Sequence, residues 1–272
     1  MRAWIFFSSI FAFLVLITAC AGTRPTLPTS QHNFLSNAKI GVVVLHGKWG
    51  SPDGKPTKPL IAALEREGFL VSVPEMPWSG RRGYDNSYEE AMNEIDKAVS
   101  ELKQQGATQI FIAGHSMGAN GAIGYAARKH VAGVIALAPG HVPDVTRNIY
   151  ADDVERAKKM VAVGNGNDQL NVTDSNQGKK KEVTLKASIY LSYFDPNGAA
   201  NMANNASNIK AGTAFLWVVG SQDKMSERGS AYAFDKAPAN SISKYLVVNS
   251  DHFKTPEDAI PEILAWLAQF NP

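Results

Sequence analysis

A serine, an aspartate and a histidine each follow an apolar run of the sequence. Ser116 lies in "IFIAGHSMG", Asp223 closely follows "LWVVG", and His252 closely follows "YLVV". A serine hydroxyl is a weak nucleophile at neutral pH unless a base takes its proton, and a histidine can accept and later return that proton. A carboxylate on the other ring nitrogen fixes the tautomer and stabilises the charged imidazole. The three residue types therefore indicate nucleophilic catalysis, with Ser116 as nucleophile.

The glycines beside Ser116 bear on how this hydroxyl is presented. Gly114 and Gly118 stand two residues on either side of it, between the run "IFIA" and a segment rich in Gly and Ala. A strained strand-to-helix turn would need this space. The helix that follows would direct free backbone N–H groups at a developing oxyanion, with the Met117 N–H as one donor. The alternative is a buried hydroxyl that only fills a tight turn.

The acid and the base also have alternatives. Asp223 could form a turn, and His252 could belong to a surface loop. Asp251 and Asp195 are the substitutes for the acid, although Asp251 adjoins the histidine and would struggle to reach its ring. No spacing of His, Cys and Glu residues suggests a metal site, so we expect catalysis with neither metal nor cofactor.

The segments that must position these residues alternate between two patterns. Continuous apolar runs predict strands buried on both faces, and apolar residues three and four apart predict helices. The predicted strands are "KIGVVVLHG", "FLVSVPEMP", "QIFIAG", "VAGVIALAP", "TAFLWVVG" and "KYLVV". Helices are predicted over residues 59–67, 88–105, 119–129, 227–234 and 255–270, the last with Thr255 as its N-cap. This alternation predicts an α/β fold, a mostly parallel sheet with helices on both faces.

Residues 141–210 break the alternation and are predicted to form an inset, a small cap over one edge of the sheet. One helix is predicted at "DDVERAKKMVA", and the following "GNGNDQLNVTDSNQGKKKE" is interpreted as a polar loop. The lysine run 179–181 is interpreted as part of a solvated loop rather than a partner site. Because loops near the carboxyl ends of strands carry function, the inset is expected to border the site.

With these residues in place, the sequence resembles the α/β-hydrolase family. The order Ser…Asp…His at successive strand ends is that of the family, and the resemblance covers about residues 39–269 apart from the inset. It implies that Ser116, Asp223 and His252 are nucleophile, acid and base. The Lys48 N–H would be the second oxyanion donor. It also implies an α/β-hydrolase fold, and carboxylic esters or thioesters as substrates, cleaved through an acyl-enzyme.

Two other functions stay open. A peptidase or amidase of the same fold would usually carry an added domain or a carboxylate patch for a substrate amine, and the sequence has no clear one. A surface-anchored binding protein would keep the fold without turnover, although the intact set of three residues argues against this. Dehalogenases and epoxide hydrolases of this fold use an aspartate where Ser116 stands, so they are disfavoured.

Aromatic residues near the strand ends predict a pocket for the acyl or alcohol part of a small-molecule ester. Trp49 and Trp78 follow the first two predicted strands, His141 follows the fourth, and Tyr193 belongs to the inset. An apolar lining of this kind is typical of ligand sites. The alternative is that these aromatic residues only pack the inset against the core.

The N-terminal stretch "MRAWIFFSSIFAFLVLITAC" has the basic start, apolar run and small residue of a secretory signal. It resembles the bacterial lipoprotein signal, which implies cleavage before Cys20 and lipid attachment to it. We therefore expect a signal peptide over residues 1–19, a tether over 20–37 and the hydrolase domain over 38–272. The lipid would hold the protein at a membrane of the cell envelope, on the periplasmic or cell-surface side. The alternative is a transmembrane anchor.

Composition narrows the function classes further. The formal net charge of +2 over 272 residues gives no footprint for nucleic acid, which usually needs a concentrated basic face. The single cysteine excludes an intramolecular disulfide. A hydrophobic content of 44% is ordinary for a globular protein and is enough for one large core.

Overall fold

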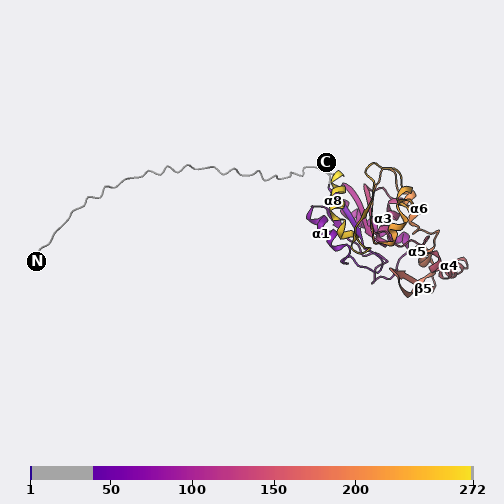
Figure 1. Cartoon of the computed structure of the whole chain (residues 1–272). Coiled ribbons are helices and arrows are strands. Elements are labelled where there is room, and N and C mark those ends of the chain that lie inside the picture. Colours follow the sequence, from indigo (N-terminus) through magenta and orange to yellow (C-terminus); the bar gives the residue numbers. More distant parts are fainter. Residues whose placement is uncertain (2–38, 271–272) are drawn as a thin grey trace. The chain divides into compact units, whose positions relative to one another are not determined.

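A six-stranded parallel sheet runs through the part of the chain that the computed structural model describes, which is Met1 and residues 39–270 (Figure 1). The predicted signal peptide, Cys20 and the tether lie outside the described residues. The strand order is β2-β1-β3-β4-β7-β8, and each neighbouring pair is parallel. The strands are β1 (Ile40–Leu45), β2 (Leu70–Ser72), β3 (Gln109–His115), β4 (Gly133–Leu137), β7 (Ala214–Gly220) and β8 (Lys244–Val248).

The register of the sheet brings the carboxyl ends of the central strands to one level. Leu45 pairs with Gly114, Gly114 with Ala136, and Ala136 with Trp217. Strands β1, β4 and β7 are buried along their whole length, which explains their unbroken apolar sequences. The loops that follow β1, β3, β4 and β7 therefore start side by side at one edge of the sheet.

Helices cover both faces of the sheet, and side chains of the strands alternate between two cores. Val43 and Leu45 join one core, which packs against α2, α3 and α6, whereas Val42 and Val44 join the other, which packs against α1 and α8 (Figure 1). The mostly parallel sheet flanked by helices confirms the predicted fold class. The helices are α1 (Lys58–Arg66), α2 (Tyr88–Gln104), α3 (Met117–Arg128), α6 (Met202–Ser207), α7 (Thr255–Asp258) and α8 (Ile260–Leu267).

Two predicted helices are wrong in detail. The segment predicted as one helix over residues 255–270 begins after Lys254 as its N-cap and is interrupted at Ala259, because Pro261 cannot continue the hydrogen-bond ladder. The segment predicted as a helix over 227–234 forms three short 3-10 turns instead, at Lys224–Arg228, Ser230–Tyr232 and Phe234–Lys236. Gly229, with φ of 62°, separates the first two of these turns.

The inset contains two helices and a two-stranded antiparallel hairpin ahead of α6. The elements are α4 (Arg147–Ala162), β5 (Gln169–Asn176), β6 (Lys179–Lys186) and α5 (Ala187–Phe194). Helix α4 packs against α5 and β5, as the neighbouring labels in Figure 1 indicate. The predicted polar loop is therefore wrong. Gln177 and Gly178 have φ of 47° and 78°, the left-handed pair that a two-residue hairpin turn requires.

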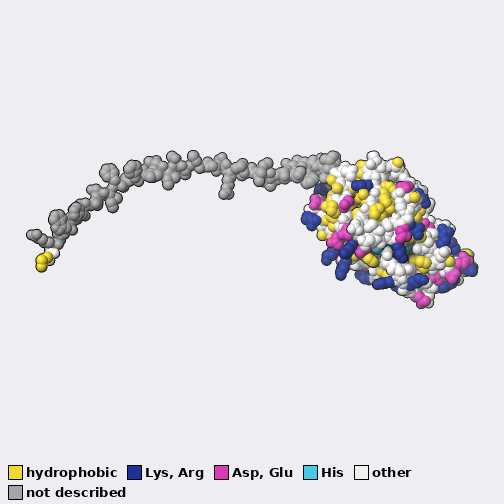
Figure 2. All heavy atoms as spheres, viewed as in Figure 1, with side chains coloured by type: hydrophobic (Ala, Val, Ile, Leu, Met, Phe, Trp, Pro, Cys, Tyr) yellow, Lys and Arg dark blue, Asp and Glu magenta, His cyan; other side chains and the backbone are white. Residues whose placement is uncertain are grey.

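The surface of the described region is mixed in charge. On the face shown in Figure 2, Lys and Arg side chains are interspersed with Asp and Glu side chains. Of the helices in residues 39–270, none combines the length and the apolar character needed to cross a membrane.

Candidate active site

Ser116 stands on a sharp turn between β3 and α3. Its backbone has φ of 56° and ψ of −115°, a region that costs a non-glycine residue about 1–3 kcal/mol. The neighbouring glycines allow this turn, because a Cβ on Gly114 would overlap the Gly118 carbonyl and a Cβ on Gly118 would overlap the Leu45 carbonyl. The Gly140 N–H donates to the Ser116 carbonyl at 3.1 Å. The two glycines thus leave room for the strained turn, and the hydrogen bond from Gly140 holds it in place.

His252 and Asp223 form a buried pair beside this serine. The His252 Nδ1–H donates to Asp223 Oδ2 at 2.6 Å, and the Met225 N–H donates to Asp223 Oδ1 at 2.9 Å. Burial raises the pKa of Asp223, but these hydrogen bonds outweigh it and hold the pKa below the usual range. A Cβ on Gly140 would lie 2.8 Å from Ser116 Oγ and 3.6 Å from His252 Cε1, so the serine hydroxyl and the imidazole both lie next to Gly140.

Two further histidines hold the loops around this pair. The His115 Nε2–H donates to the His252 carbonyl at 2.8 Å, and burial lowers the pKa of His115 to about 4. His46 donates through Nδ1–H to the Gly47 carbonyl at 2.9 Å and accepts the Met76 N–H at 3.0 Å. Burial lowers the pKa of His46 as well, which keeps the ring neutral for these two bonds.

The two predicted oxyanion donors have no acceptor within the described chain. Neither the Met117 N–H, at the start of α3, nor the Lys48 N–H, after β1, donates to a protein group in residues 39–270. The loop that carries Lys48 is fixed next to it, since the Trp49 N–H donates to the Trp78 carbonyl at 2.9 Å. Both N–H groups are therefore available to a ligand at Ser116.

A wholly buried carboxylate of the hairpin binds this same loop. Asp174 Oδ1 accepts from Lys48 Nζ at 2.7 Å and from the Ser175 N–H at 2.8 Å. Asp174 Oδ2 accepts from Trp49 Nε1 at 2.6 Å and from the Tyr84 hydroxyl at 2.9 Å. Four donors thus surround one carboxylate that comes from the inset. We call these four residues together with Asp174 the Asp174 brace.

The Asp174 brace joins the hairpin to the loop after β1. Burial lowers the pKa of Lys48, and the neighbouring Asp174 carboxylate opposes this by favouring the charged form. Lys48 Nζ also donates to the Ser175 carbonyl at 2.9 Å, and the Asn176 amide donates to the Lys48 carbonyl at 3.1 Å. The backbone that carries one predicted oxyanion donor is therefore positioned by residues about 126 positions later in the chain.

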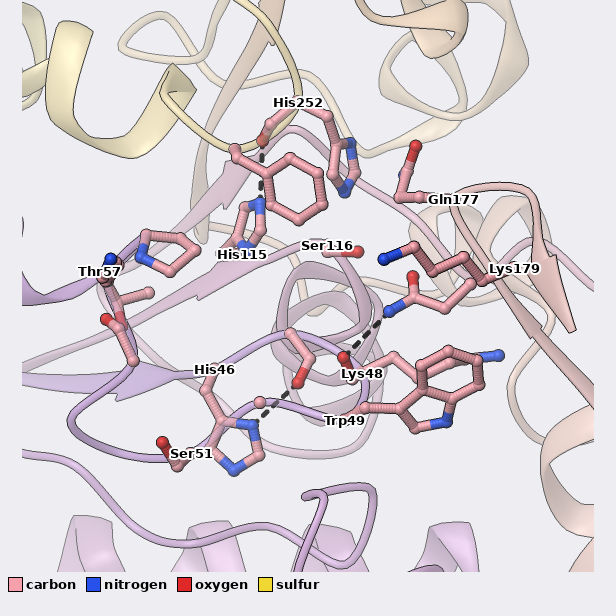
Figure 3. Close-up of a pocket in the computed structure, with 17 residues that line it drawn as sticks. His46, Lys48, Trp49, Ser51, Thr57, His115, Ser116, Gln177, Lys179 and His252 are labelled. Carbon is pink, nitrogen blue, oxygen red and sulfur yellow. Dashed lines mark hydrogen bonds between the residues drawn. The ribbon is translucent and has the colours of Figure 1, made fainter. Parts of the chain in front are cut away.

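Two cavities open beside Ser116 and share it with His252 and Lys48. The smaller, of about 580 Å³, lies between the loop after β1 and the hairpin turn (Figure 3). The larger, of about 810 Å³, lies between the loop after β4, α4 and the turn after β7. An ester bound at Ser116 could therefore place its acyl part in one cavity and its alcohol part in the other.

The predicted pocket residues divide between these cavities and the core. Trp49 lines the smaller cavity and His141 lines the larger. Trp78 is fully buried in the core, donating from Nε1 to the His46 carbonyl at 2.8 Å, and lines neither cavity of the described region. Tyr193 is also fully buried and accepts a bond from His141 Nε2–H through its carbonyl at 2.9 Å. Their predicted place in the pocket is wrong, because both rings fill the core instead.

Tyr193 belongs to an aromatic cluster between the inset and the core. Its ring lies 5.0 Å from that of Tyr84 and 5.6 Å from that of Tyr88, both edge to face, and the Phe194 ring lies 5.0 Å from that of Tyr150. Such pairs add to the free energy gained from burial alone. For Tyr193, the alternative that the aromatic residues attach the inset to the core is the one that the contacts support.

The sequence did not single out Asp174 or the lysines near it as site residues. Asp174 lies in a polar run, where a carboxylate is expected in solvent. The signal that could have found it is weak: in "NVTDSN" Val172 and Asp174 lie two residues apart, so both point to the same, buried face of a strand. His115, which lies directly before the nucleophile in the sequence, contacts the loop of the predicted base.

The fold and the geometry of Ser116, His252 and Asp223 define an α/β-hydrolase. Residues 37–252 match the hydrolase family described as serine aminopeptidase, S33 (Hydrolase_4), and the chain belongs to this family. The match includes Ser116 and Asp223 and ends at His252.

Several proteins similar to this chain in sequence or structure are named as lipases or esterases. The thermostable monoacylglycerol lipase of Bacillus sp. (strain H-257) is 26% identical over 118 residues, which cover 42% of this chain and 46% of that protein. The monoacylglycerol lipase of Paleococcus ferrophilus superposes with a TM-score of 0.60 at 22% identity, over 85% of this chain and 96% of the other. Est1E from Butyrivibrio proteoclasticus, with bound ferulic acid, has a TM-score of 0.57 at 18% identity, over 87% and 92%. The sequence match thus spans about half the length of the curated relative.

Proposed function

We propose that this protein is a serine hydrolase that cleaves carboxylic esters through an acyl-enzyme on Ser116. The observation that carries the proposal is the strained turn, which places the Ser116 hydroxyl next to Gly140, where the His252 ring of the buried His252–Asp223 pair, joined at 2.6 Å, also lies. The relatives named as monoacylglycerol lipases and esterases support ester substrates. Thioesters would follow the same acyl-transfer steps.

In the first half of the reaction, Ser116 Oγ attacks the ester carbonyl carbon while its proton passes to His252 Nε2. Asp223 stabilises the imidazolium that forms, and the Met117 and Lys48 N–H groups bind the oxyanion. The tetrahedral intermediate collapses when the bond from carbon to the alcohol oxygen breaks. The alcohol leaves with the proton from His252, and the acyl group stays on Ser116.

In the second half, a water molecule attacks the acyl carbon and gives its proton to His252. The bond between carbon and Ser116 Oγ then breaks, Oγ takes the proton back, and the carboxylic acid leaves. The protein groups end as they began, so the cycle needs no resident metal or cofactor.

A peptidase is the second candidate, because the family description reads serine aminopeptidase. An aminopeptidase recognises a positively charged substrate amine, which requires a carboxylate beside the nucleophile. The smaller cavity is lined by Lys48, Lys55 and Lys179, and no Asp or Glu is among its lining residues in the described region. The larger cavity includes Glu227, but Lys180, Lys224 and Arg228 line it as well, so the net charge around Ser116 favours esters over peptides with a free amine.

A lipid on Cys20 would place this hydrolase at a membrane of the cell envelope, and we include it in the proposal. The support is the sequence alone: an apolar run after Arg2 that ends in a small residue before the only cysteine. We expect the protein to partition with membranes and a Cys20→Ala variant to appear in the soluble fraction. Unchanged membrane partition of that variant would indicate a transmembrane anchor instead.

The central experiment combines covalent labelling with turnover. A fluorophosphonate probe should label Ser116 in the folded protein, and the protein should hydrolyse a series of 4-nitrophenyl esters of increasing acyl length. Ser116→Ala should lose the labelling and lower kcat by about four to six orders of magnitude. Ser100→Ala, on the exposed side of α2, is the matched control and should keep both. A folded protein without labelling or turnover would be a binding protein.

A further inference from the structure

Three adjacent lysines at the start of β6 lie over the cleft without carboxylate partners. Lys179, Lys180 and Lys181 are exposed, and none of them forms an ion pair within residues 39–270. Lys181 is paired across the strands with Asp174, but that carboxylate is enclosed by the Asp174 brace. Neighbouring like charges repel one another, so an anion bound here would be favoured.

The lysines reach both cavities beside the nucleophile. Lys179 lines the smaller cavity together with Ser116 and His252, and in Figure 3 its side chain extends from the hairpin toward Ser116. Lys180, which points to the other face of the strand, lines the larger cavity. Lys181 Nζ lies 4.3 Å from the centre of the Trp49 ring. The hairpin therefore brings exposed ammonium groups to the edge of the cleft.

The smaller cavity combines these charges with an apolar wall. Lys55, on the loop after β1, adds a second ammonium group that forms no ion pair in the described chain. Trp49, Pro56 and the half-exposed Phe253 supply apolar surface. A ligand with an apolar body and one negative group would satisfy both features. The sequence-based interpretation of a merely solvated lysine run does not account for this placement.

We propose that the preferred substrate is an ester that also carries an anionic group, a carboxylate or a phosphate, bound by Lys179 and Lys55 beside Ser116. This inference rests on the proposed ester hydrolysis and adds the charge of the substrate to it. The lysines bind and orient the ester, and the chemical steps stay with Ser116, His252 and Asp223.

Two matched pairs of esters distinguish where the negative group sits. Mono-(4-nitrophenyl) adipate and 4-nitrophenyl hexanoate differ by a carboxylate at the end of the acyl chain. 1-Butanoylglycerol 3-phosphate and 1-butanoylglycerol differ by a phosphate on the alcohol. In at least one pair, we expect kcat/KM to be about fivefold to tenfold higher for the anionic ester at low salt. This preference should be smaller in 0.5 M NaCl, because at that ionic strength the attraction between neighbouring charges is screened.

Variants of the hairpin assign the preference to its lysines. Lys179→Met should reduce the ratio of kcat/KM between the anionic and neutral esters to about one, and Lys179→Glu should invert it. Lys186→Met is the matched control: Lys186 is an exposed lysine at the far end of the same strand and lines neither cavity. It should leave the ratio and the rate on the neutral ester as in the wild type.

Three outcomes would overturn the inference. One is a preference for the neutral ester in both pairs, and another is a ratio that Lys179→Met and Lys179→Glu leave unchanged. The third is that a Lys179→Met, Lys180→Met protein loses binding to phosphatidylglycerol vesicles but keeps the ratio of kcat/KM between anionic and neutral esters. The lysines would then bind a membrane surface rather than the substrate. Failure of the proposed function is seen separately, as no fluorophosphonate labelling and no hydrolysis of the neutral esters, and it removes the inference as well.

Discussion

The parallel sheet and the inset of residues 141–210 contribute to the site in different ways. The sheet carries Ser116, Asp223 and His252 on loops after β3, β7 and β8, where the parallel register of the strands sets their positions. The inset contributes no residue of this set. It supplies the Asp174 brace and the three lysines of the hairpin. The comparison indicates that the sheet positions the three residues of this set, whereas the inset braces the loop after β1 and adds positive charge to the cleft.

The sheet and the inset are also stabilised by different kinds of interaction. The sheet buries continuous apolar strands, so that its stability comes from the removal of apolar surface from water. The hairpin is largely exposed and is fixed to the loop after β1 through a buried ion pair, and an aromatic cluster attaches α5 of the inset to the core. A polar attachment of this kind is sensitive to the loss of one partner. The predictions below test this difference, from the largest effect to the smallest.

The Asp174 brace should be the most sensitive point of the inset. Asp174→Asn leaves the Lys48 ammonium buried without its counter-charge, and we expect a loss of about 3–5 kcal/mol in the free energy of unfolding. Because the loop with the Lys48 N–H loses its support, kcat should fall by about tenfold to a hundredfold with a smaller change in KM. Urea denaturation and steady-state kinetics measure the two effects.

A double variant separates charge from geometry in the same place. Lys48→Met combined with Asp174→Asn removes both charges and should recover much of the lost stability. The backbone N–H of residue 48 is retained, but the hairpin no longer holds it, so kcat should stay low. An Asp174→Asn protein with wild-type kcat would mean that the inset does not position the loop.

A pair of glycine substitutions compares the regions directly. Gly118→Ala places a Cβ against the Leu45 backbone, which cannot move without shifting β1, and should cost about 3 kcal/mol or more. Gly164→Ala, after α4 of the inset, meets no atom within 4 Å and strains only a φ of 87°, so it should cost about 1 kcal/mol. Thermal or urea unfolding measures both, and equal losses would contradict the proposed difference.

The pH dependence of stability should trace to the buried histidines. Burial lowers the pKa of His115 to about 4 from its usual 6.5, so the unfolded chain binds this proton first as the pH falls. The stability contribution is complete above about pH 6.5 and is lost progressively toward pH 4. Between pH 7 and pH 5, the loss from His115 should be about 2 kcal/mol.

The variant His115→Gln identifies this contribution. Its free energy of unfolding should fall less between pH 7 and pH 5 than that of the wild type, by about 2 kcal/mol. His130→Gln, at an exposed position after α3, is the control and should change with pH as the wild type does. His141, whose pKa burial lowers to about 3, contributes in the same direction from the inset side.

The smallest effect is expected at Lys181, an exposed residue of the hairpin that lies over the Trp49 ring. Lys181→Met removes a cation–π contact at 4.3 Å and should destabilise the protein by about 0.5 kcal/mol. Lys186→Met should change the stability by less than that. Because the ring stays in place through Trp49 Nε1 and Asp174, kcat should change little.

The strands of the sheet and the three residues at their ends could be predicted from the sequence, whereas the hairpin could not. Apolar runs that end at Ser116, Asp223 and His252 predict both the strands and the edge where these residues meet, because parallel strands deliver their following loops to one place. The hairpin was missed, since a run such as "NVTDSNQGKKKE" buries only alternate side chains and looks like a loop. Asp174 becomes recognisable only when the Lys48 side chain lies opposite it.

Aromatic residues were the least predictable part of the site. Trp49 and Trp78 both follow strands, and the sequence treats them alike. In the structure Trp49 lines the smaller cavity, whereas Trp78 lies in the core. A Cβ on Gly121 would lie 2.8 Å from the Trp78 ring. That outcome depends on the space left by α3, which no local pattern of the sequence records. By contrast, the helix break at Ala259 could have been predicted from Pro261.

The ion pair between Lys48 and Asp174 has a consequence for the timing of folding. The two residues are 126 positions apart, so the loop after β1 can reach its final place only after the chain has been made as far as the hairpin. Catalytic competence should therefore arrive late, after the strands that precede the inset have paired. In a partly folded chain, the Lys48 N–H would reach its final position only when the hairpin packs against Lys48.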